Sequence, residues 1–170
     1  LEPWSLQQKK LKKKLAWEIY QKNILKKADY IHATSPAEKI HVEELKIKTP
    51  IKVLPHGIEI QKENYVRNNS IKKAIFFSRI HEKKGLLELV ESWKVLNHPN
   101  WILDIYGPVS NKNYLLLVKK KIIELNLSEK VKILEPVYNK EKKKEILGNS
   151  DLFILPSKSE NFGMSIGEAM

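Results

Sequence analysis

The chain has 170 residues, of which 42% are apolar, and its formal net charge is +11. This length fits one domain or parts of two, and the apolar content is ordinary for a globular protein. Cysteine is absent, which excludes disulfides and thiolate metal sites and agrees with a reducing cytoplasm. These residues contain neither a signal peptide nor an apolar run long enough to cross a bilayer.

The positive charge invites a nucleic-acid-binding function, but its distribution argues against one. Of the 31 basic residues, two are arginine, Arg67 and Arg79, and the lysines are spread over predicted helices and loops. Arginine grips phosphate through paired hydrogen bonds better than lysine does. We therefore expect no nucleic-acid partner, and the position of an arginine in this lysine-rich chain becomes informative.

The first 60 residues predict helices around two short strands. A basic helix with an imperfect apolar stripe is expected over roughly residues 4–28. Short strands are predicted at 30–33 and 51–54, and Ser35 is expected to cap a helix over 37–45 between them.

From residue 74 onward, short apolar strands alternate regularly with helices. Strands are predicted at 74–77, 101–106, 131–134 and 151–155, and helices at 85–96, 111–125 and 139–147. A last helix opens near Gly163, and because helices average about 11 residues we expect it to continue past Met170. This alternation predicts an α/β fold, a Rossmann-like parallel sheet with helices on both faces.

The unusual residues follow the ends of these predicted strands, where parallel sheets bind their ligands. In strand order they are Arg79 and Lys84, then Gly107, then Val137 and Tyr138, then Glu160 and Glu168, which stand eight positions apart. Carboxylates accept hydrogen bonds from sugar hydroxyls, fixed cations stabilise a departing diphosphate, and a helix start offers N–H groups to anions. The pattern predicts a nucleotide-sugar site.

Two stretches of the sequence form a recognisable pair of motifs. They are Arg-Ile-His-Glu-Lys-Lys-Gly at 79–85, and Glu-Asn-Phe-Gly at 160–163 followed by Glu-Ala-Met at 168–170. Together they resemble the donor-binding lobe of group-one, family-four retaining glycosyltransferases. The resemblance runs from about residue 26 to 170 and implies part of the two-lobed glycosyltransferase-B fold. It implies that 1–60 is the C-terminal part of the acceptor-side lobe, 61–70 a linker, and 71–170 a donor-binding lobe incomplete at its C-terminus.

The resemblance also implies roles for the charged residues. Arg79 and Lys84 would contact the donor diphosphate, with the functional interpretation stronger for Arg79. Glu160 would hold hydroxyls of the donor sugar near the anomeric carbon, and Glu168 would hold the ribose hydroxyls. The alternative is that these are solvated surface charges. Lys83 is the neighbour that we do not expect to act.

Further contacts implied by the resemblance are made mainly by backbone. Gly107 would let the chain pass close to the ligand, although a simple turn explains it equally well. Val137 and Tyr138 would lie near the nucleobase, although packing explains the Tyr138 side chain more readily than a contact with the base does. Backbone amides around Asn161, Phe162 and Gly163 would support the sugar and phosphate. The chain departs from the family pattern at Ser78, where Gly is common, and at His56, where Asn is frequent.

The family transfers a hexose with retention of configuration and generally without a metal, so we expect neither metal nor cofactor beyond the nucleotide-sugar donor. The five histidines show no metal-ligand spacing. The opening residues 1–4 and the basic helix are similar to members that build lipopolysaccharide or other surface glycans, which implies a glycan or lipid-linked acceptor in the cytoplasm. Contact of the lysine run at 9–14 with anionic lipid is the minority interpretation. The oligomeric state stays open, and we expect this fragment alone to be inactive.

Three other functions remain open at this point. A nucleotide-sugar epimerase on the same fold would need no acceptor. A basic nucleic-acid-binding module would bind duplexes with a steep salt dependence. A non-catalytic sugar-binding domain would keep Glu160 but need not keep Arg79.

Overall fold

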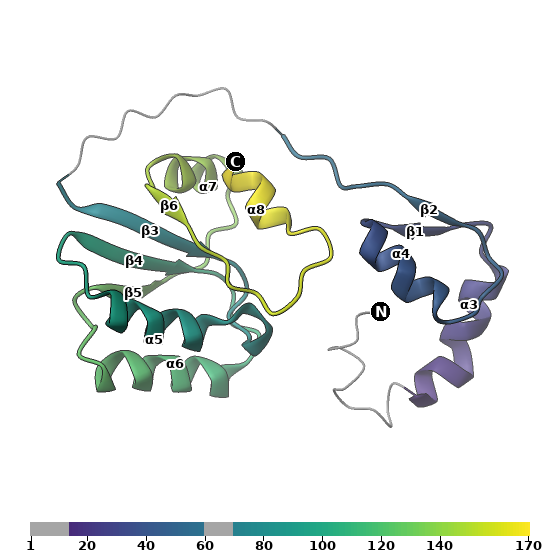
Figure 1. Cartoon of the computed structure of the whole chain (residues 1–170), viewed down its shortest axis with the longest axis horizontal. Coiled ribbons are helices and arrows are strands. Elements are labelled where there is room, and N and C mark those ends of the chain that lie inside the picture. The colour runs from purple at the N-terminus through teal and green to yellow at the C-terminus, as the bar shows by residue number, and fades with distance from the viewer. Residues whose placement is uncertain (1–13, 60–69) are drawn as a thin grey trace. The chain divides into compact units, whose positions relative to one another are not determined.

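The computed structural model describes residues 14–59 and 70–170 (Figure 1). It divides into two units, one comprising the residues up to Ile58 together with Glu160–Met164, the other Glu59–Ser159 with Ser165–Met170. Most of the predicted linker at 61–70 and the first ten residues of the helix predicted at 4–28 lie outside the described residues.

The first unit contains a small parallel sheet and two helical segments. The helix at 14–16 continues as a π-helix, η1 (Trp17–Gln21), and then as α3 (Lys22–Lys27). Strand β1 (Ile31–Ala33) pairs in parallel with β2 (Ile51–Val53), and α4 (Pro36–Glu43) connects them. The Ser35 hydroxyl accepts a hydrogen bond from the Glu38 N–H at 3.1 Å, so the predicted N-cap is confirmed.

The second unit is built on a four-stranded, all-parallel sheet. Its strands are β3 (Lys72–Phe77), β4 (Trp101–Tyr106), β5 (Val131–Leu134) and β6 (Leu152–Phe153). Their spatial order is β5-β4-β3-β6. The predicted fold class is therefore confirmed, although β6 pairs over two residues where the sequence predicted a strand at 151–155.

Helices cover both faces of this sheet (Figure 1). Helices α5 (Leu86–Leu96) and α6 (Lys112–Glu124) lie on one face, and α7 (Lys140–Gly148) and α8 (Met164–Ala169) on the other. Successive side chains of a strand point to opposite faces. In β3, Ala74 and Phe76 accordingly join the core under α5 and α6, whereas Ile75 and Phe77 join the core under α7.

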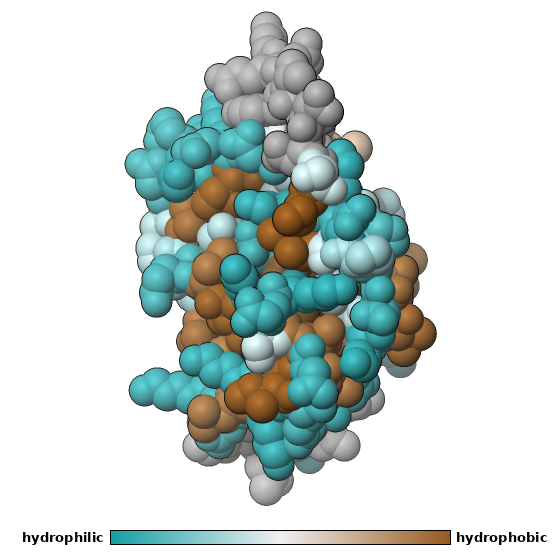
Figure 2. Space-filling view, turned by 90° about the vertical axis from the view of Figure 1, so that its left-hand side faces the viewer, coloured by the Kyte–Doolittle hydropathy of each residue, from teal (hydrophilic) through white to brown (hydrophobic). Residues whose placement is uncertain are grey.

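Asparagine side chains cap two of these helices. The Asn111 side-chain oxygen accepts hydrogen bonds from two N–H groups at the start of α6, and that of Asn139 accepts one from the Lys142 N–H at 2.7 Å. The sequence prediction counted both caps within their helices, so each helix begins one residue later than predicted. Figure 2 shows hydrophilic and hydrophobic residues interspersed over the side of the molecule that faces the viewer.

Candidate functional site

The strand order places a topological switch point between β3 and β6. The chain moves from β3 outward to β4 and β5, and then returns to form β6 on the other side of β3. Open parallel sheets bind ligands at such a point, outside the carboxyl ends of the strands. The loops that leave β3 and β6 are the ones in which the sequence predicted Arg79, Lys84 and Glu160.

The loop after β3 is held by backbone hydrogen bonds to the loop after β4. The Ile80 N–H donates to the Pro108 carbonyl at 2.9 Å, and the Ser110 N–H donates to the Ile80 carbonyl at 3.2 Å. Gly107 has a φ of +153°, and a Cβ on it would overlap the Ser78 carbonyl oxygen. The close approach that requires glycine here is therefore between two loops of the chain.

A short helical turn, η2 (Glu82–Lys84), carries the two lysines of this loop. The His81 side chain caps it, because Nδ1 accepts a hydrogen bond from the Lys83 N–H at 3.1 Å. Gly85 follows with φ +67°, which lets the chain turn directly into α5.

The loop after β6 packs against the loop after β3. The Lys158 N–H donates to the Lys83 carbonyl at 2.9 Å, and the Lys158 ammonium pairs with Glu88 of α5 at 2.9 Å. The hydrogen bond from Lys158 lowers the pKa of Glu88 below its ordinary value. A Cβ on Gly85 would overlap the carbonyl oxygen of Pro156. The two loops that the sequence predicted at one sheet edge are therefore in contact.

The cations of the site differ in burial. Lys84 is 8% exposed, Lys83 is partly exposed and Arg79 is exposed. Lysine is rarely buried, because removing its charge from water is costly. Burial thus distinguishes Lys84 from its neighbour Lys83. The roles predicted for Lys84 and Arg79 stay predictions.

Ser157 is a residue of this edge to which the sequence analysis gave no role. Its Oγ is buried and has no hydrogen-bond partner within residues 14–59 and 70–170. Buried polar atoms in folded proteins are nearly always hydrogen-bonded, so the Ser157 hydroxyl is an unusual group at this edge. No sequence signal marks this serine, since serine is common in loops.

Glu168 lies in α8, and its carboxylate pairs with the ammonium of Lys143 from α7. The same ammonium stands 5.1 Å from the centroid of the Phe77 ring, at the end of β3. Lys143 was not predicted from the sequence, because nothing in the local pattern distinguishes it from Lys140, Lys142 and Lys144.

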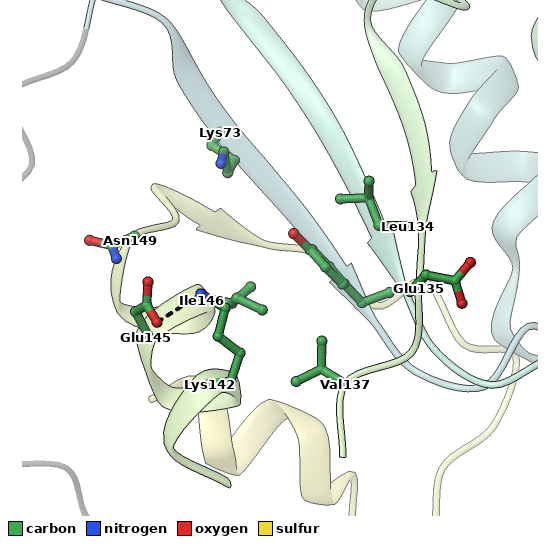
Figure 3. Close-up of a pocket in the computed structure, with 9 residues that line it drawn as sticks. Lys73, Leu134, Glu135, Val137, Lys142, Glu145, Ile146 and Asn149 are labelled. Atoms are coloured by element: carbon green, nitrogen blue, oxygen red, sulfur yellow. Dashed lines mark hydrogen bonds and ion pairs between the residues drawn. The ribbon is translucent and has the colours of Figure 1, made fainter. Parts of the chain in front are cut away.

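Val137 and Tyr138 lie in different environments. Val137 lines a cavity of about 390 Å³ on the face of the sheet covered by α7, whereas Tyr138 is 80% exposed. In Figure 3, Val137 and Leu134 turn toward this cavity from the end of β5, and α7 supplies the other side. The full lining is Lys73, Tyr106, Leu134, Glu135, Val137, Lys142, Glu145, Ile146 and Asn149. The cavity contains one predicted site residue, so it is not the predicted site as a whole.

The segment after Ser159 belongs to the first unit up to Met164. Within that unit, the Asn161 side-chain amide donates to the Glu38 carboxylate at 2.9 Å, and the Phe162 ring meets His56 edge-on at 5.6 Å between centroids. Glu160 is partly exposed, and Gly163 is buried with φ +73° just before α8 begins. The φ of Gly163 explains why a glycine stands at the helix start.

The described residues contain neither a cluster of metal-binding side chains nor a membrane-spanning helix. Within residues 14–59 and 70–170, no three His, Asp or Glu side chains are grouped to hold a metal ion. In the same part of the chain, no helix has the length and apolar character that crossing a membrane requires.

Residues 57–170 match the family model described as glycosyl transferases group 1. The chain belongs to this family. No curated protein matches it. The family membership agrees with the resemblance seen in the sequence at 79–85 and 160–170.

Solved glycosyltransferases share the fold. Sucrose-phosphate synthase from Thermosynechococcus elongatus matches 93% of this chain with 41% of its own, at 21% identity and a TM-score of 0.77. Alr3699/HepE from Anabaena, solved with UDP and glucose, matches 84% of this chain with 42% of its own, at 21% identity and a TM-score of 0.72. The lipopolysaccharide outer core galactosyltransferase WaaB matches 84% of this chain with 40% of its own, at 19% identity and a TM-score of 0.64. The group 1 chain thus has part of the glycosyltransferase-B fold and spans about two fifths of these structures' chains.

Proposed function

We propose that this group 1 chain forms the donor-binding part of an enzyme that moves a hexose from a nucleotide sugar to a hydroxyl acceptor. The observation that carries the proposal is the buried Lys84 at the switch point, in a loop joined by hydrogen bonds to the loop after β6. A buried cation at this place suits a ligand with a diphosphate, which gains negative charge as its bond to the sugar breaks.

In this proposal the cations and the carboxylates divide the donor between them. Arg79 and Lys84 contact the diphosphate and stabilise it as the leaving group. Glu160 holds hydroxyls of the donor sugar, and Glu168 holds the ribose. The pairing of Glu168 with Lys143 supports a fixed carboxylate, because an ion pair limits the orientations of both side chains.

Backbone and apolar groups complete the proposed donor site. Amides around Asn161, Phe162 and Gly163 support the sugar and phosphate, and Gly107 stands close to the ligand. Val137 and Tyr138 lie beside the nucleobase. Residues 1–60 form the end of the acceptor-side lobe, 61–70 the linker, and 71–170 the donor lobe.

The family pattern supports transfer with retention of configuration and without a metal ion or other cofactor. We propose that the intact enzyme stays active in excess chelator, because Arg79 and Lys84 supply the charge that a metal would otherwise provide. Loss of activity that magnesium or manganese restores would refute this part of the proposal.

The acceptor is proposed to be a lipid-linked or polysaccharide glycan of lipopolysaccharide or another surface glycan, made in the cytoplasm. Its support is the character of residues 1–28 and the shared fold with a lipopolysaccharide galactosyltransferase. A peripheral contact with the inner membrane face is part of the same proposal.

Calorimetry of the full-length enzyme with nucleoside diphosphates and nucleotide sugars tests the proposed function. We expect both ligands to bind, and Lys84→Ala to weaken both more than Lys83→Ala does. Binding of duplex DNA with a steep salt dependence and no preference for nucleoside diphosphates would overturn the proposal. Product analysis with donor alone separates a transferase from an epimerase, since the epimerase converts the donor without an acceptor.

A further inference from the structure

The turn that carries Lys84 depends on an imidazole for its start. His81 Nδ1 accepts a hydrogen bond from the Lys83 N–H at 3.1 Å, and the Lys84 N–H donates to the His81 carbonyl at 2.9 Å. The turn has three residues, Glu82–Lys84, and ends at Gly85, whose N–H donates to the Glu82 carbonyl at 3.3 Å. A turn this short has few hydrogen bonds of its own, so its cap contributes a large share of its stability.

We propose that His81 is a positioning residue for the donor site, and that it holds Lys84 in place only while its Nδ1 is unprotonated. This inference rests on the proposed function, because it assigns to Lys84 the contact with the donor diphosphate. His81 itself acts through η2 and needs no contact with the donor.

The proton decides whether the cap can form. A neutral imidazole has one nitrogen that accepts and one that donates, so acceptance at Nδ1 assigns the proton to Nε2. A protonated imidazole donates from both nitrogens. Nδ1 then carries a hydrogen directed at the Lys83 N–H, and the cap is replaced by repulsion between two donors.

The structure supplies an alternative partner for the protonated ring. Glu82 Oε2 stands 3.4 Å from His81 Nδ1. The same carboxylate is held from the other side by the Asn111 side-chain amide of α6, which donates to Oε1 at 2.6 Å. A protonated Nδ1 can therefore donate to this carboxylate instead of accepting from the Lys83 N–H.

His81 stands among several charged groups. Those of its own loop are Glu82, Arg79, Lys83 and Lys84. From the neighbouring elements come Lys158 of the loop after β6, which is paired with Glu88 of α5, and Tyr114 of α6, whose hydroxyl accepts the Leu87 N–H at 3.1 Å. Burial raises the pKa of Tyr114, so this phenol stays neutral in the range where histidine titrates.

The test is the pH profile of donor KM in the full-length enzyme, for the wild type, His81→Asn and His81→Ala. Asparagine keeps an oxygen that can accept the N–H two residues on, but it does not titrate. In the wild type we expect donor KM to rise as the pH falls from about 8 to about 5.5, the range of histidine titration. His81→Asn should keep a low KM that is flat over this range.

His81→Ala removes the cap at every pH. We expect its donor KM to be raised about tenfold, because losing one cap changes a free energy by an amount of this order. The raised KM should be independent of pH. Glu82→Gln, which removes the alternative partner, should move the acid limb of the wild-type profile to lower pH. An acid limb that persists unchanged in His81→Asn, or equal KM values for His81→Asn and His81→Ala, would overturn the inference.

The two proposals fail in different ways. If the proposed function is wrong, the wild type shows no nucleotide-sugar binding at any pH. If the role of His81 is wrong, the wild type binds the donor, but His81→Asn and His81→Ala have the same donor KM at each pH.

Discussion

The carbonyl oxygen of Pro156 lies where the Cβ of any larger residue at position 85 would stand. Gly85 also has a φ of +67°, a conformation that L-residues with a Cβ adopt at a cost. Because glycine has no Cβ and adopts this φ without strain, the loop after β3 and the loop after β6 can touch at the switch point. A single missing Cβ thus permits the approach on which the candidate site depends.

We predict that Gly85→Ala destabilises the protein. The left-handed backbone costs about 1–2 kcal/mol for a residue with a Cβ, and the overlap with Pro156 adds to it because backbone cannot move aside easily. Urea denaturation of the full-length protein measures the effect. Gly57→Ala is the matched control, since a Cβ there meets nothing within 4 Å. Equal midpoints for the two variants would contradict the described contact between the loops.

Lys83 and Lys84 are adjacent in the chain and differ in burial, so their substitution by alanine can be compared directly. We predict that Lys84→Ala and Arg79→Ala each lower turnover of the full-length enzyme by about 10²–10³, the usual effect of losing a charge contact in the transition state. Lys83→Ala should be mild, because its side chain is less buried than that of Lys84. Steady-state kinetics with saturating donor measures this. Comparable losses for Lys83→Ala and Lys84→Ala would mean that the register assigned to the loop is wrong.

The two acids are expected to serve different parts of the donor. Glu160→Gln should lower turnover with the nucleotide sugar and barely change the binding of a bare nucleoside diphosphate. Glu168→Gln should weaken both ligands, because both carry ribose. An amide keeps the shape but loses charge-assisted hydrogen bonds, each worth about 1.5–3 kcal/mol. Calorimetry with both ligands measures the difference, and equal weakening of the bare diphosphate by both variants would end this division of roles.

Removal of the Ser157 hydroxyl should separate stability from binding. Its Oγ is buried without a hydrogen-bond partner in the described part of the chain, so Ser157→Ala removes an unpaired polar atom. We predict an unchanged or slightly raised free energy of unfolding together with weaker donor binding. Thermal melts with and without nucleoside diphosphate test both halves. A clear fall in the melting temperature without ligand would show that the hydroxyl has a structural partner.

Much of the fold follows from local signals in the sequence. The apolar runs that form β4 and β5 were predicted with the bounds that the structure shows. The strand β3 alternates between two cores because side chains alternate along any strand. The predicted cap Ser35 accepts a hydrogen bond from an N–H group three residues away, so a short-range pattern was enough to find it. Asn111 and Asn139 cap their helices in the same way, but they were predicted inside them.

Other features depend on contacts between residues far apart in the chain. The sequence predicted β6 but not its place beside β3, because parallel strands pair through long crossovers that local pattern does not specify. The two-residue length of β6, the π-helix at η1 and the pairing of Lys143 with Glu168 were likewise not predicted.

By itself, then, the sequence determined the alternation of strands and helices, the Ser35 cap and the resemblance of residues 79–85 and 160–170 to a glycosyltransferase donor lobe. Tertiary structure decided that Lys84 is buried, that the Ser157 Oγ has no hydrogen-bond partner among the described residues, and that position 85 must be glycine. The physical reason is that helices and caps are set by neighbours within a few residues. Burial and strand order depend on contacts between segments that are distant in the chain, as between 78–85 and 156–158.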